Sequence, residues 1–147
     1  LPHHTLGAAL RLEGKCREAI PHFLEAKAIW EKTLGTSHHQ TSAAYFDLGV
    51  CYTDLGRVQE ALPLLEKTVE IRVAANRSNG AIAEAKWQLG RALWESGKDK
   101  PRGLALVQES QRKLAGLRQG REIDTWLAAH KLAPAAPPPV APTPQPK

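Results

Sequence analysis

The chain has 147 residues, of which 42% are hydrophobic and 24% charged, and its formal net charge at pH 7 is +5. This length and composition fit one ordinary globular domain. The sequence contains no run of about 18 or more apolar residues, so we expect no membrane-spanning helix. It begins at Leu1 and contains no methionine. We therefore expect a piece of a longer protein. We also expect a cytoplasmic location.

The residue types that carry chemistry are not arranged in sites. Cys16 and Cys51 lack the C-x-x-C spacing, so we interpret both as small buried core residues that need no oxidising compartment. His3-His4 and His38-His39 are adjacent pairs that would point to different faces of a helix and chelate poorly, and we expect His38 to have a structural role in a connector. No phosphate-binding loop, nucleophile elbow or kinase motif occurs. We expect no metal, no cofactor and no catalysis in this segment.

Three segments of the sequence share one pattern of leucine and glycine. A Leu-Gly pair recurs at offsets of 42 and 41 residues, and a second glycine follows each pair seven residues after the first glycine. The pairs are Leu6-Gly7, Leu48-Gly49 and Leu89-Gly90, and the second glycines are Gly14, Gly56 and Gly97. Repetition at such a period is typical of solenoid proteins, in which similar units stack in a row.

Each unit is predicted to contain two helices. From residue 41 to 55, apolar residues recur at spacings of three and four, which indicates an amphipathic helix, and Gly56 is a natural stop. A second helix is predicted from about 58 to 74, with Pro63 near its first turn, where a missing N–H does least harm. Small residues at Gly49 and Ala61 would let the two antiparallel backbones approach closely.

These positions resemble the tetratricopeptide repeat, and the long period resembles the kinesin-light-chain type of array. The third unit needs one extra residue near Pro101 so that Gly103, Val107 and Ser110 occupy the later slots. The matching residues are Leu6, Gly7, Leu10, Gly14, Ala19, Phe23 and Ala26 in repeat one; Tyr45, Leu48, Gly49, Tyr52, Gly56, Ala61 and Leu65 in repeat two; and Leu89, Gly90, Leu93 and Gly97 in repeat three.

The resemblance implies an all-α fold, an α-solenoid of three tandem helix hairpins at about 1–35, 41–75 and 80–118. A capping helix is expected over 119–132, with Ile123, Trp126 and Leu127 on one side, because a stack of repeats leaves an open apolar end. Residues 133–147 are rich in proline and alanine, and we expect a disordered and inert tail rather than a ligand for aromatic grooves.

The resemblance also implies a function, the binding of a partner protein or peptide on the concave surface that the first helix of each repeat lines. The residues that we expect to bind the partner are Phe46, Val50, Asp54, Glu84, Trp87, Arg91 and Trp94. Ala43, Thr53, Glu95, His4, Ala8 and Arg11 also fall at ligand-facing positions of the motif. For Trp87 and Trp94 the alternative is packing under the capping helix beside Trp126.

Two other readings of the sequence stay open. Residues 83–113 and 123–130 resemble the C-terminal tetratricopeptide regions of serine/threonine kinases of the myxobacterial type, which implies a regulatory role beside a kinase domain outside this chain. Residues 97–147 carry nine basic and four acidic side chains, a balance that can attract nucleic acid. These charges form no dense run, so a solvated surface is the favoured interpretation.

Overall fold

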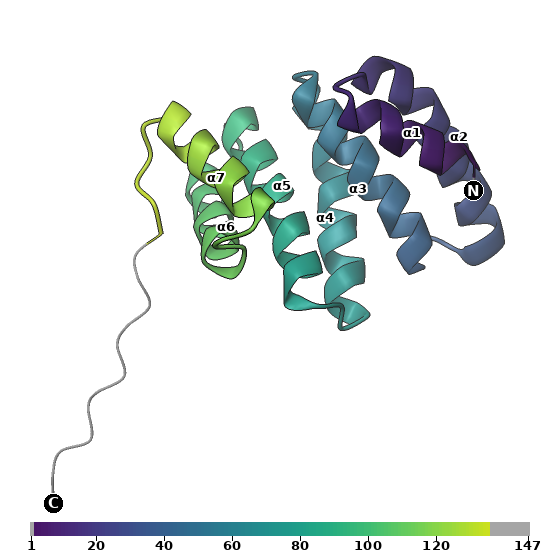
Figure 1. The fold of residues 1–147 in the computed structure, drawn as a ribbon. Coiled ribbons are helices and arrows are strands. Elements are labelled where there is room, and N and C mark those ends of the chain that lie inside the picture. The colour runs from purple at the N-terminus through teal and green to yellow at the C-terminus, as the bar shows by residue number, and fades with distance from the viewer. Residues whose placement is uncertain (1, 136–147) are drawn as a thin grey trace, which may run out of the picture.

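The computed structural model describes residues 2–135, and the seven elements in this part of the chain are all α-helices (Figure 1). They pair into three hairpins, α1–α2, α3–α4 and α5–α6, which follow one another in a row with α7 at the far end. This is the all-α solenoid that the sequence predicted. The helices are α1 (Pro2–Leu12), α2 (Cys16–Leu34), α3 (His39–Asp54), α4 (Val58–Ala74), α5 (Asn79–Ser96), α6 (Lys100–Lys113) and α7 (Arg118–Ala129).

The second glycine of each repeat turns the chain back on itself. Gly14, Gly56 and Gly97 have φ angles of 77°, 76° and 73°, the left-handed conformation that other residues adopt only at a cost. Each lies within the short connection between the two helices of its hairpin. The recurring glycine therefore closes the first helix and lets the second return antiparallel to it.

The first glycine of each repeat lies where the two helices of a hairpin touch. A Cβ added at Gly49 would lie 2.6 Å from Leu65 Cγ, and one added at Gly7 would lie 2.7 Å from Phe23 Cε1. The atoms nearest to the Cβ added at Gly49 belong to Leu65, one helical turn beyond Ala61 on α4. Ala61, the other small residue of the predicted close approach, is fully buried. A leucine side chain reaches into the space that a Cβ would need.

In the third hairpin the backbones themselves meet. A Cβ at Gly90 would lie 2.6 Å from the Gly103 carbonyl oxygen, and Gly103 occupies the slot that Ala61 has in the second hairpin. Gly103, Val107 and Ser110 are all buried in α6, which confirms the extra residue expected near Pro101. Pro63 is the sixth residue of α4, so it lies in the second turn rather than near the first.

Polar side chains cap the N-termini of three helices. His38 Nδ1 accepts a hydrogen bond from the Gln40 backbone N–H at 3.1 Å and caps α3, which confirms its structural role in the connector. Ser78 Oγ accepts from the Ala81 N–H at the start of α5, and Asp99 accepts from the Arg102 N–H at the start of α6. Such caps satisfy backbone donors that a helix leaves free at its N-terminus.

The two cysteines are bonded to each other. Cys16, the first residue of α2, and Cys51, in the last turns of α3, form a disulfide that joins the first hairpin to the second, with their Cα atoms 5.1 Å apart. Both side chains are buried, as expected, but the expectation of unpaired core residues was wrong. Stacking of the hairpins brings the start of α2 beside the end of α3, a contact that the spacing of two cysteines does not reveal.

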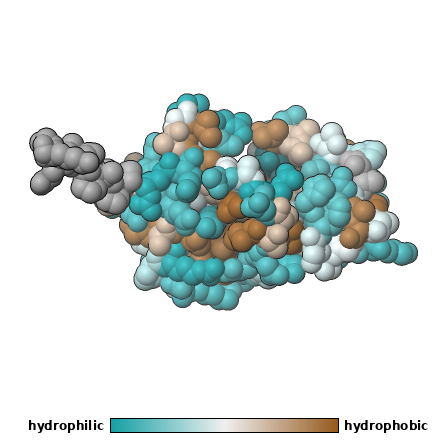
Figure 2. All heavy atoms as spheres, turned by 90° about the horizontal axis from the view of Figure 1, so that it is seen from below, coloured by the Kyte–Doolittle hydropathy of each residue, from teal (hydrophilic) through white to brown (hydrophobic). Residues whose placement is uncertain are grey.

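Beyond the helices, residues 133–135 lie against α6. Gln108 Nε2 donates to the Ala133 carbonyl at 3.2 Å, and the Ala135 N–H donates to Gln111 Oε1 at 2.6 Å. The rest of the expected tail, residues 136–147, lies outside the described residues. Seen from below, the surface of the molecule is mostly hydrophilic, with hydrophobic residues gathered near the middle of this face (Figure 2).

Gly90→Ala tests the backbone contact in the third hairpin. The added Cβ has no room beside the Gly103 carbonyl, so we expect the free energy of unfolding to fall by about 1–3 kcal/mol. Gly80→Ala, in the same helix, is the matched control, because a Cβ there meets no heavy atom of the described residues within 4 Å. The control should be neutral or stabilise by up to about 1 kcal/mol. Urea denaturation checks both, and a Gly90→Ala variant as stable as the control would contradict the contact.

Candidate functional site

A cavity of about 610 Å³ opens between α1, α3, α5 and α7, and we call it the groove. Six of the seven residues predicted to bind a partner line it. These are Phe46, Val50 and Asp54 on α3 and Glu84, Trp87 and Arg91 on α5. Arg11 and Leu12, at the end of α1, form another part of the wall. The groove thus spans all three hairpins.

The spacing of the lining residues explains why they share one wall. Phe46, Val50 and Asp54 are four residues apart, so they lie on one face of α3. Trp87 and Arg91 have the same spacing on α5. Since the hairpins stack in register, these two faces turn toward the same side of the molecule.

Trp94, the seventh predicted residue, does not line the groove. Its ring packs edge-on against Trp126 of α7, with 6.3 Å between ring centroids, and the Lys100 ammonium lies 4.9 Å from its ring centre. Packing beside Trp126 was the alternative that the sequence left open. Glu95 also contacts α7, since it accepts a hydrogen bond from Trp126 Nε1 at 3.4 Å.

The other ligand-facing positions of the motif are divided among several places. Arg11 lines the groove, whereas Ala43 and His4 line a second cavity of about 490 Å³ that shares Glu84 with it. Thr53 is buried and donates its hydroxyl to the Gly49 carbonyl within α3. Ala8 packs against the main core.

Trp87 and Arg91 place buried hydrogen-bond donors at the groove. Trp87 is only 3% exposed and packs edge-on to Trp126, yet its indole Nε1 is buried and has no hydrogen-bond partner among the described residues. Arg91 Nη1 pairs with Asp54 Oδ1 at 2.8 Å, while its buried Nε and Nη2 have no such partner. Buried polar groups are nearly always hydrogen-bonded, so these N–H groups are available to further acceptors.

A buried carboxylate fastens α1 to α3 beside the groove. Asp47 Oδ2 lies 2.8 Å from His4 Nε2, and Asp47 Oδ1 lies 3.0 Å from Arg11 Nε. Arg11 and the α1 terminus are therefore held in position by charge. Repeat-based reasoning missed Asp47, because the motif assigns no role to this position; its one signal was a charge within the buried run of α3.

Arg72 and Glu84 are charged groups with little solvent around them. The Arg72 guanidinium lies 4.6 Å from the centre of the Phe46 ring and donates to the Ala81 carbonyl at 2.7 Å. Burial lowers the pKa of Arg72, and burial raises the pKa of Glu84, although the nearby charges of Arg72 and Arg11 act in the opposite direction on Glu84. A carboxyl that is easier to protonate thus lies where the two cavities meet.

Helix α7 supplies a whole wall that the sequence analysis did not assign to the site. It contributes Arg118, Gln119, Glu122, Thr125, Trp126 and Ala129 to the groove. The ligand-facing positions were carried over from the repeat motif, and α7 lies outside the three repeats. Its apolar side was predicted to cap the stack, but nothing in the pattern indicated where its polar side would lie.

With this geometry in view, comparisons with known proteins identify the family. Residues 2–74 match the family model described as tetratricopeptide repeat. Residues 2–74 are tetratricopeptide repeats. This stretch contains the first two hairpins, α1 to α4, and the third hairpin continues the same stack.

The relatives and solved structures that resemble this chain are named for kinesin light chains. The Arabidopsis thaliana proteins named KINESIN LIGHT CHAIN-RELATED 2 and 3 are 34% and 33% identical over 98 and 81 residues, or 66% and 54% of this chain. The chain spans only 15% and 12% of their lengths. Two crystal structures of kinesin-light-chain TPR-like repeats from Podosopora anserina share the fold at a TM-score of 0.69 and 24% identity, covering 87% of this chain and 63% of theirs.

Within the described part of the chain, the tetratricopeptide hairpins show neither a metal cluster nor a membrane span. No group of three or more His, Cys, Asp or Glu side chains there could hold a metal ion. None of the described helices is both long enough and apolar enough to cross a membrane. The relatives give no information on a kinase domain, so the kinase parent stays a prediction.

The buried carboxyl in the tetratricopeptide groove predicts a pH-dependent stability. Because the pKa of Glu84 is raised in the folded state, the folded protein keeps a proton that the unfolded chain loses, and stability falls as pH rises above the ordinary value of 4.5. Glu84→Gln removes the buried charge. We expect a higher melting temperature than wild type at about pH 7.5 and none of this advantage below about pH 4.

Glu122→Gln is the matched control for this pH profile, because Glu122 lines the same groove but is exposed. This variant should keep the pH profile of the wild type in thermal unfolding followed by circular dichroism. A Glu84→Gln variant that is less stable than wild type at neutral pH would contradict the prediction, since attraction to Arg72 would then outweigh the cost of burial.

Proposed function

We propose that this chain is a non-catalytic scaffold that holds a partner protein by binding an extended, acidic segment of it in the groove. The observation that carries the proposal is the set of buried donors on Trp87 and Arg91. All of them are N–H groups of side chains that line the groove, so a ligand that supplies acceptors suits them. A carboxylate suits a guanidinium best, because it can accept two parallel hydrogen bonds.

The apolar part of the wall supports a peptide as the ligand. Phe46, Val50 and Trp126 lie along the same cavity as the arginine side chains. Aromatic and arginine residues dominate the binding energy of protein interfaces. A segment with an apolar side chain next to an acidic one would fill both kinds of surface.

Acidic groups in and beside the groove make nucleic acid a poorer ligand. Asp54, Glu84 and Glu122 line the cavity, and Asp47 lies behind Arg11. A polyanion would meet these carboxylates along its length, whereas a peptide can place single carboxylates opposite Arg91 and Arg11. We therefore favour a protein partner over the nucleic acid that the basic C-terminal region suggested.

Selection from a phage-displayed peptide library tests this function. The selected peptides should be rich in Asp and Glu, and fluorescence anisotropy then gives their dissociation constants. Arg91→Gln should weaken binding by about 10-fold or more, the value of a charge-assisted hydrogen bond. Trp87→Phe, which keeps an aromatic ring in the core but removes the indole N–H together with part of the ring system, should weaken it by about 2- to 10-fold.

The matched control is Arg121→Gln, which removes the same charge from an exposed position of α7 outside the groove lining. It should leave peptide affinity unchanged. Selected peptides without acidic enrichment, or an equal loss of affinity in Arg121→Gln and Arg91→Gln, would overturn the proposal.

A further inference from the structure

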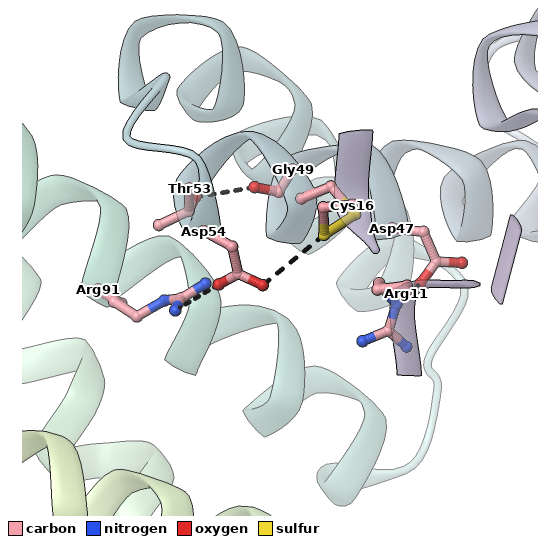
Figure 3. The surroundings of a disulfide bond; sticks show 8 residues. Arg11, Cys16, Asp47, Gly49, Thr53, Asp54 and Arg91 are labelled. Atoms are coloured by element: carbon pink, nitrogen blue, oxygen red, sulfur yellow. Dashed lines mark hydrogen bonds and ion pairs between the residues drawn. A yellow bond between two sulfur atoms is a disulfide. The ribbon is translucent and has the colours of Figure 1, made fainter. Parts of the chain in front are cut away.

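The disulfide lies at the point where all three hairpins meet. Cys16 belongs to the first hairpin and Cys51 to the second. Asp54, almost one turn after Cys51, has its Oδ2 3.9 Å from Cys16 Sγ and its Oδ1 2.8 Å from Arg91 Nη1 in the third hairpin (Figure 3). A single carboxylate therefore separates the sulfur atoms from the cation of the groove.

The neighbouring junction of the solenoid does without such a bond. Shifted by one repeat, Cys16 corresponds to Val58, the first residue of α4, and Cys51 corresponds to Ala92 on α5. Non-covalent contacts, among them the hydrogen bond from Arg72 to the Ala81 carbonyl, thus hold α4 against α5, and the fold does not require a covalent bond at this position. The disulfide between α2 and α3 is therefore not needed for two hairpins to stack, since apolar residues occupy the same positions at the next junction.

The first hairpin has a direct effect on the groove. Its α1 contributes Arg11 and Leu12 to the wall, and the contacts of Arg11 and His4 with Asp47 connect it to α3. Each repeat of a solenoid contacts only its neighbours, and a single unit can open locally without unfolding of the whole stack. A bond that ties this hairpin to the next one therefore also holds one wall of the groove in place.

We propose that the Cys16–Cys51 disulfide is a redox clasp, which fixes the first hairpin and its groove wall when oxidised and releases them when reduced. Reduction by a dithiol breaks the S–S bond and forms two S–H groups, while the dithiol loses two electrons and two protons and becomes a disulfide. Two unbonded sulfur atoms need more space than a bonded pair, so the cysteine side chains must rotate away from each other or α2 and α3 must separate.

Reduction also changes the hydrogen bonding at the centre of Figure 3. The disulfide sulfur of Cys16 carries no hydrogen, but a thiol there can donate to Asp54 Oδ2. Cys16 and Arg91 would then share the Asp54 carboxylate, with one donor at each oxygen. The redox state of the two cysteines therefore affects the Arg91 guanidinium through Asp54, the residue that both Cys16 and Arg91 contact.

We expect thiol–disulfide exchange at the Cys16–Cys51 bond to be slow. Cys16 is 5% exposed and Cys51 is not exposed at all, so a reductant reaches the bond chiefly when the first hairpin opens. The Asp54 carboxylate beside Cys16 repels an approaching thiolate, the attacking species in disulfide exchange. The state of the clasp therefore follows the redox conditions over long times, not brief fluctuations.

Hydrogen exchange measured by mass spectrometry tests the clasp. The protein is oxidised in a glutathione buffer or reduced with a phosphine, and alkylation with iodoacetamide verifies each state by mass. Peptides of α1 and α2 should exchange about 10-fold faster or more after reduction, since the tether no longer limits local opening. Peptides of α6 should not change. The Trp87 indole N–H resonance, assigned by its loss in Trp87→Phe, should shift on reduction.

The double variant Cys16→Val/Cys51→Ala is the matched control, because it places the residues of the second junction into the first. It should exchange like the reduced wild type and show no response to the phosphine. Free thiols under oxidising conditions, or α1 and α2 exchange that is equal in both states, would overturn the proposal. So would a double variant as protected as the oxidised protein, because packing alone would then hold the hairpin.

Discussion

The approach of two helices at one glycine is the contact on which the rest of the molecule depends. At Gly7, Gly49 and Gly90 a Cβ would collide with the second helix of the hairpin, so the pair packs more closely than ordinary side chains permit. The three hairpins have this close contact at the same position of the repeat and can therefore stack in register. Only because they stack do residues four apart on α3 and α5 form one wall.

Much of this architecture was predictable because its signals are local. Gly56 ends a helix through its own backbone conformation, and the Leu-Gly spacing repeats the same packing contact in each unit. The register then placed Phe46 and Arg91 on the groove. The motif did not reveal that Leu65 fills the space beside Gly49, since it gives positions on a helix but not the reach of a side chain.

Contacts between distant segments could not be predicted in this way. The Cys16–Cys51 bond depends on how two hairpins stack, and the sequence separation of the two cysteines carries no trace of it. The wall from α7 depends on how a helix outside the repeats docks. The expected cytoplasmic location remains a prediction, and it bears on the clasp, because reducing systems in the cytosol keep thiols unpaired.

The docking of α7 has a consequence for the stability of the bound state. Trp126 touches Trp87 and Trp94 on α5, and the same helix closes the groove. A ligand that requires this wall binds only the docked arrangement, so occupancy and docking are linked equilibria. If the ligand raises the docking constant of α7 by some factor, docking of α7 raises the affinity for the ligand by the same factor. The C-terminal helix is in this sense a second binding partner, carried on the same chain.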